Sequence, residues 1–70
     1  MVEIIFTKHV KVQMKERGIS EDEITNTIKF SEKTRKIGNI YYAQKKTTSG
    51  TIEVVFEKEN YIKVITSYWI

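Results

Sequence analysis

Three polar side chains that could do chemistry follow one another at four-residue intervals near the start of the chain. They are His9, Gln13 and Arg17, and His9 is the only histidine in the sequence. On a helix, residues four apart lie on the same side, so the three form one slowly drifting polar stripe. A neutral imidazole in a first helical turn can accept a proton near pH 7, and a guanidinium can stabilise a phosphate or an oxyanion. His9 and Arg17 are therefore candidate catalytic residues.

The separation of His9 and Arg17 limits what they can do together. Their α-carbons would lie roughly 12 Å apart along a helix that rises about 1.5 Å per residue. Arg17 leans back toward the helix N-terminus, but it covers only part of that gap. The pair could bind two parts of one extended ligand rather than act on a single atom. A structural alternative stays open, in which His9 hydrogen-bonds a sheet residue and Arg17 pairs with an acid.

A second candidate site is a basic stretch interleaved with tyrosines. Between Lys29 and Lys46 the only acidic residue is Glu32. Such a stripe can attract a phosphate backbone, and a tyrosine ring can stack on a base. A solvated strand whose lysines deter edge-to-edge aggregation would give the same pattern. The candidate nucleic-acid-binding residues are Lys33, Arg35, Lys36, Tyr41, Tyr42, Lys45 and Lys46.

Two helices must position the first of these sites. Thr7 can cap a helix over Lys8–Arg17, and Gly18 suits the left-handed position just past its end. Ser20 and Glu23 then form a capping-box pattern for a second helix of about eleven residues that ends near Phe30 or Ser31. In the same motif, Ile19 before the cap can pack on Ile24 as a hydrophobic staple.

The rest of the chain alternates with period two and predicts strands. Lys33–Ile37, the turn Gly38–Asn39 and Ile40–Thr47 are typical of a hairpin. In the next strand Ile52, Val54 and Phe56 alternate with Glu53, Val55 and Glu57. In the last strand Ile62, Val64 and Thr66 alternate with Tyr61, Lys63 and Ile65.

Several residues outside this alternation complete the expected fold. Val55 and Ile65 fall on the face opposite the main core set, and Tyr68-Trp69-Ile70 is expected to tuck over the core as a tail. Val2–Phe6 adds a short apolar strand. The predicted fold is an α+β domain in which two N-terminal helices pack on a curved antiparallel sheet of about four strands, with a short N-terminal strand at an edge.

Size and composition narrow the classes of protein. Seventy residues make one domain, 1–70, and a chain this short buries little surface, so we expect a homodimer. The chain has no cysteine and a single histidine, so we expect no disulfide, no metal site and no cofactor. The apolar runs are too short to span a membrane, and the N-terminus lacks the pattern of a signal peptide, so a cytoplasmic protein is expected.

The order of these motifs resembles a known family. T-K-H-V-K-V-Q-M-K-E-R-G-I-S-E-D-E-I, then T-I-E-V-V-F-E and finally I-K-V-I-T-S-Y, is similar to domain-of-unknown-function family 4258, a relative of the RelE/ParE toxin superfamily. The matching positions are His9, Arg17, Gly18, Ile19, Val54, Val55, Val64, Ile65 and Thr66. Gln13 stands where that family usually places an arginine. The resemblance implies RelE-like helices on a curved sheet and a role in a toxin–antitoxin-like system.

Three functions are compatible with this resemblance. The protein could bind RNA or an antitoxin-like protein without catalysis, cleave RNA as a metal-independent endoribonuclease, or act as a homodimeric scaffold. Cleavage would proceed by attack of a 2′-hydroxyl on its neighbouring phosphate, with His9 as base or acid. Arg17, Lys45 and Lys46 would neutralise charge, and Tyr41 or Tyr42 would stack a base. Gln13 in place of an arginine and the modest net charge of +3 favour the binding function.

Overall fold

Two helices and five strands make up the computed structural model, which describes residues 3–70. In chain order they are β1 (Ile4–Phe6), α1 (Lys8–Arg17), α2 (Glu21–Phe30), β2 (Lys33–Ile37), β3 (Ile40–Thr47), β4 (Gly50–Lys58) and β5 (Ile62–Trp69). The predicted α+β class is confirmed, and both helices have the predicted extent to within one residue. The predicted N-terminal strand is present over Ile4–Phe6, whereas Val2 lies outside the described residues.

The strands form one mixed sheet in the order β1-β5-β4-β3-β2. β2 to β5 are an antiparallel meander, as the alternation predicts, and β1 pairs with β5 in parallel. The expected antiparallel sheet of about four strands with a short N-terminal strand at an edge is thus compatible with the observed sheet, which has five strands and one parallel pair at that edge. The parallel pair arises because the chain leaves β1 for the helices and the meander before it returns beside β1.

Local signals set the helix ends. The Thr7 hydroxyl accepts a hydrogen bond from the Val10 amide, and Gly18 adopts the left-handed conformation with φ 66° after α1. The Ser20 hydroxyl accepts from the Glu23 amide while the Glu23 carboxylate accepts from the Ser20 amide, so the predicted capping box is complete. These caps satisfy backbone groups that the helix itself leaves without a partner.

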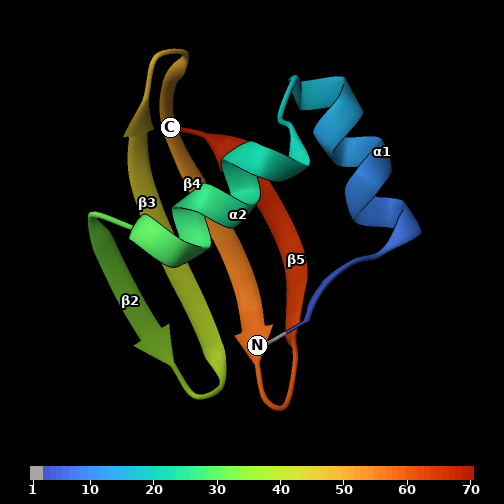
Figure 1. Cartoon of the computed structure of the whole chain (residues 1–70), viewed down its shortest axis with the longest axis vertical. Helices are drawn as coiled ribbons and strands as arrows, with labels where there is room; N and C mark the ends of the chain where they lie inside the picture. The colour runs from blue at the N-terminus through green and yellow to red at the C-terminus, as the bar shows by residue number, and fades with distance from the viewer. Residues whose placement is uncertain (1–2) are drawn as a thin grey trace.

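α2 covers one face of the sheet, and α1 lies along the β5 side of it (Figure 1). The core between these layers is apolar, and its fully buried members include Val10, Ile24, Ile52, Val54 and Val64. This packing fixes which face of each strand is covered.

A register shift in the sheet changes the expected facing of the last strand. The pairing of β4 with β5 shifts between Val55 and Phe56, so Val55 pairs with Thr66 while Phe56 pairs with Val64. Ile65 is the extra residue at this irregularity. The prediction that Thr66 shares a face with Ile62 and Val64 is therefore wrong.

The expected C-terminal tail is part of the last strand. Tyr68 and Trp69 belong to β5 rather than to a separate tail. Trp69 packs against the core as predicted, and Tyr68 faces the other way because strand side chains alternate.

Candidate nucleic-acid interface

The face of the sheet opposite α2, here called the open face, has no helix over it within residues 3–70 (Figure 1). Strand register places two rows of side chains across it, because directly paired residues share a face. The glutamate row is Lys33, Gln44, Glu53 and Tyr68, one from each of β2 to β5. The tyrosine row is Arg35, Tyr42, Val55 and Thr66. Four strands that are separate in sequence thus contribute to one polar surface.

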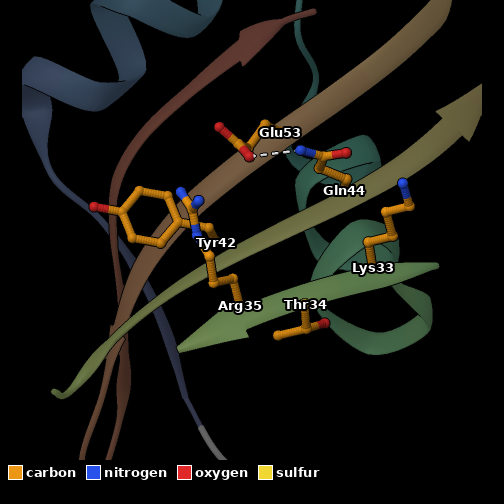
Figure 2. A pocket seen from close by; sticks show the side chains of 6 residues that line it. All are labelled: Lys33, Thr34, Arg35, Tyr42, Gln44 and Glu53. Carbon is orange, nitrogen blue, oxygen red and sulfur yellow. Dashed lines mark hydrogen bonds between the residues drawn. The ribbon is translucent and has the colours of Figure 1, made fainter. Parts of the chain in front are cut away.

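Hydrogen bonds join the centre of the glutamate row. The Gln44 amide nitrogen donates to Glu53 Oε1 at 2.8 Å, and the Tyr68 hydroxyl donates to Glu53 Oε2 (Figure 2 shows the Gln44 bond). Glu53 is only 8% exposed, although no helix covers this face. The flanking side chains therefore cover most of the residue and hold it in place, while Glu53 still lines a hollow on this face.

The same contacts determine the protonation states of Glu53 and Tyr68. The hydroxyl of Tyr68 lowers the pKa of Glu53, burial opposes that effect, and the Gln44 amide and the Arg35 charge lower the pKa further. The hydrogen bond to Glu53 also raises the pKa of Tyr68, with burial acting in the same direction. At neutral pH the pair is thus a carboxylate that accepts from a neutral phenol.

A hollow lies between the two rows at the β2 edge of the sheet. Its volume is about 400 Å³, and Figure 2 shows the residues that line it: Lys33, Thr34, Arg35, Tyr42, Gln44 and Glu53. The Arg35 guanidinium carbon lies 4.8 Å from the centre of the Tyr42 ring, which is cation–π geometry. The hollow therefore combines cations, an aromatic ring and one fixed anion.

The predicted catalytic stripe meets the far end of the tyrosine row. Thr66 donates to Gln13 Oε1 at 3.2 Å, and the Gln13 amide nitrogen lies 3.0 Å from His9 Nε2. Arg17 donates to the Thr66 hydroxyl at 3.2 Å and to the Ser67 carbonyl at 2.7 Å. The bonds of Arg17 to β5 thus differ from the acid pairing considered for it. Gln13 and Thr66 link His9 and Arg17 in one network despite their spacing on the helix.

The predicted nucleic-acid-binding residues divide between the two faces. Lys33, Arg35 and Tyr42 lie on the open face. Tyr41 lies on the helix side, where its ring stacks on Phe56 with a centroid distance of 5.2 Å. The two adjacent tyrosines therefore have different surroundings.

The predicted lysines follow the same division. The Lys36 ammonium lies 5.5 Å from the Tyr41 ring centre, so it belongs to the helix side of β2. Lys45 pairs with Ile52 on the helix side, whereas Lys46 pairs with Thr51 on the open side. A second hollow shares Lys33 and Gln44 with the first, and its lining residues are Glu32, Lys33, Gln44, Lys45, Lys46 and Thr51. Three lysines and one glutamate therefore surround this hollow, whose formal charge is positive.

Sequence reasoning missed the polar centre of the site, which is Gln44, Glu53 and Tyr68. Glu53 stands between Ile52 and Val54, and a charged residue flanked by two apolar ones was the available signal. Nothing local indicated its partners, since Gln44 and Tyr68 lie on other strands.

Two further observations complete the description of residues 3–70. No group of three or more His, Cys, Asp or Glu side chains in this range could hold a metal ion. Neither helix of the described part is long and apolar enough to cross a membrane.

The fold and the site define a small α+β domain with a polar, tyrosine-bearing open sheet face. The chain belongs to the family described as domain of unknown function DUF4258, whose model matches residues 6–69. Comparison with curated proteins gave no match, and comparison with solved structures gave none.

Proposed function

We propose that this protein is a RelE-like domain that binds single-stranded RNA on its open face. The observation that supports this proposal is the juxtaposition of Lys33, Arg35 and Tyr42 around one hollow. Cations that follow a backbone and aromatic rings that stack bases are the two elements of single-strand binding. The toxin–antitoxin-like setting suggested by the sequence belongs to the same proposal.

The arrangement suits a flexible strand better than a duplex. Neighbouring strands of a sheet lie about 4.8 Å apart, so the glutamate row from β2 to β5 spans roughly 14 Å. An unpaired strand can splay its bases onto such a flat surface, whereas a double helix presents mainly its backbone and shallow groove. Lys33 and Lys46 would contact phosphates, while Tyr42 would stack on a base.

The network around His9 has a separate role in this proposal. Arg17 ties α1 to β5 through Ser67, and Thr66 ends the tyrosine row beside Gln13. The network thus extends the polar surface beyond the sheet toward α1. His9 is exposed there and available to a bound strand.

Fluorescence anisotropy with a labelled single-stranded ten-nucleotide RNA tests the proposal. The double variant Lys33→Ala/Arg35→Ala should bind more weakly, and its logarithmic salt slope should fall by about 0.7 for each phosphate that is no longer neutralised. The control Lys8→Ala/Lys11→Ala removes the same charge from exposed positions on α1 and should change binding much less. A duplex RNA of the same length should compete poorly.

Several outcomes would contradict the proposal. Wild-type protein that fails to bind the oligonucleotide at low salt would refute it, as would equal reductions in affinity in the two double variants. Gel analysis of the same RNA after incubation distinguishes binding from cleavage, the activity of the alternative endoribonuclease function. The homodimer stays a prediction, which analytical ultracentrifugation can check.

A further inference from the structure

Glu53 is an unusual residue to find in the middle of a surface that binds phosphates. Its carboxylate lines the hollow beside Lys33 and Arg35, and a phosphate placed there would be repelled. A ligand that fills the hollow must therefore bring hydrogen-bond donors to this position. Nucleobase edges carry such donors and phosphates do not, so a base rather than the backbone is the group that hydrogen-bonds to Glu53.

The two carboxylate oxygens of Glu53 are held in place, and each can accept a further hydrogen bond. Gln44 donates to Oε1 and Tyr68 donates to Oε2, from strands on opposite sides of β4. Each oxygen has two lone pairs, so each retains one acceptor position. The ionised state follows from the lowered pKa of this carboxyl group. Glu53 thus offers two adjacent acceptors and no donor.

Guanine is the natural base that matches two adjacent acceptors. Its Watson–Crick edge presents N1–H and the N2 amino group side by side, and protein groups read unpaired bases on this edge. Adenine and cytosine place an acceptor nitrogen beside their amino group, and uracil has a single N–H between two carbonyls. Their acceptors would face the carboxylate and repel it.

The surroundings of Glu53 supply the remaining contacts of a base site. The Tyr42 ring with the Arg35 guanidinium over it forms a stacking surface next to the carboxylate (Figure 2). The hollow of about 400 Å³ lies within the usual range for small-molecule pockets. Lys33 and Gln44 also line the second hollow, so a phosphate attached to the bound nucleoside can lie near its three lysines, which outnumber the single Glu32 there.

We propose that this hollow selects guanine, with Glu53 accepting hydrogen bonds from N1–H and the N2 amino group while the base lies against Tyr42 and Arg35. The selection rests on the proposed RNA-binding function when the guanine belongs to a strand. The same chemistry would bind a free guanine nucleotide. Glu53 is then the residue that determines specificity.

Anisotropy with four oligouridine RNAs tests this inference, each with one central guanosine, inosine, adenosine or cytidine. Inosine keeps N1–H but lacks the N2 amino group, so it should bind about tenfold more weakly than guanosine, as expected when one hydrogen bond to a charged group is removed. Adenosine should bind more weakly still. The Glu53→Gln variant should lose the preference for guanosine, because its amide presents one acceptor and one donor and so matches the edge of adenosine or cytidine instead.

The matched control is Glu57→Gln, on the same strand and the same face. Both variants lose one negative charge, so both should bind RNA somewhat more tightly in general, but only Glu57→Gln should keep the guanosine preference. Far-ultraviolet circular dichroism verifies that each variant is folded. The comparison of guanosine with inosine needs only wild-type protein and is independent of variant folding.

The outcomes separate the inference from the function on which it rests. Equal binding of the four RNAs by wild-type protein overturns guanine selection and leaves RNA binding intact. If guanosine monophosphate binds in a way that depends on Glu53 while no RNA binds, the guanine site is supported and the RNA-binding proposal is overturned. Absence of binding by both overturns both proposals.

Discussion

Replacing Tyr68 with phenylalanine removes one atom from the centre of the site and tests how the Glu53 carboxylate is held. The ring and its packing remain, while the hydroxyl that donates to Glu53 Oε2 is removed. Gln44 still donates to Oε1, so the carboxylate keeps one of its two neutral donors. The change isolates one hydrogen bond to a charged group.

The expected magnitude follows from the position of that bond. A hydrogen bond to a charged group contributes about 1.5–3 kcal/mol to stability when its removal leaves the partner buried. The carboxylate that loses this donor belongs to a residue that is mostly buried but lines the hollow, so water can replace part of the interaction and we expect a loss of about 1–1.5 kcal/mol. For a domain of this size the melting temperature should fall by about 5–10 °C.

The loss of stability should also depend on pH in a definite direction. The folded-state pKa of Glu53 lies below its ordinary value of 4.5, with the Tyr68 hydroxyl as the largest cause. Stability from this shift is therefore fully present above that ordinary value and is lost as the pH falls through the folded-state pKa. The difference between wild type and Tyr68→Phe should be largest near pH 7 and should shrink below about pH 4.5.

Urea denaturation followed by tryptophan fluorescence at several pH values measures this difference. Tyr61→Phe is the control, because Tyr61 lies where the chain enters β5, away from Glu53. A destabilisation by Tyr68→Phe that grows as the pH falls from 7 to 3 would refute the reasoning. Equal effects of the two substitutions at every pH would refute it as well.

Two further predictions concern the scaffold, and chemical denaturation checks both. Ile24→Ala empties a fully buried position in the core and should lower the free energy of unfolding by about 2–5 kcal/mol. The control Val12→Ala changes a position that is 52% exposed and should alter stability by less than about 0.5 kcal/mol. Similar effects of the two substitutions would contradict the assigned core. Ser20→Ala removes the N-cap of α2 and should lower the free energy of unfolding by about 1 kcal/mol. Ser20→Asp provides a capping acceptor again and should keep most of the stability. A Ser20→Asp variant as unstable as Ser20→Ala would contradict the capping role.

Local features of the fold were predictable because their causes lie within a few residues. Thr7, Gly18 and the pair Ser20–Glu23 mark helix ends through hydrogen bonds to nearby backbone groups. The hairpin turn at Gly38 needs a positive φ, and it has φ 62°. Period-two alternation likewise identified the strands, since side chains of a strand alternate between faces.

The register shift in β5 was not predictable from alternation. Strict alternation assigns Thr66 to the face of Ile62 and Val64, yet an extra residue at this point exchanges the faces of Thr66 and Ser67. Such an irregularity depends on how two strands pair and not on either strand alone. The same shift places Tyr68 on the open face, so one misassigned register hid the partner of Glu53.

By itself, the sequence determined the helix ends, the strands, the α+β class and the basic, tyrosine-bearing stretch, because caps, periodicity and composition act over short distances. Only the tertiary structure decided which residues meet. It separated Tyr41 from Tyr42, linked His9 to Arg17 through β5, and gathered Gln44, Glu53 and Tyr68 from three strands. Contacts between distant segments depend on strand order and register, and both are set by how the whole apolar surface is buried at once.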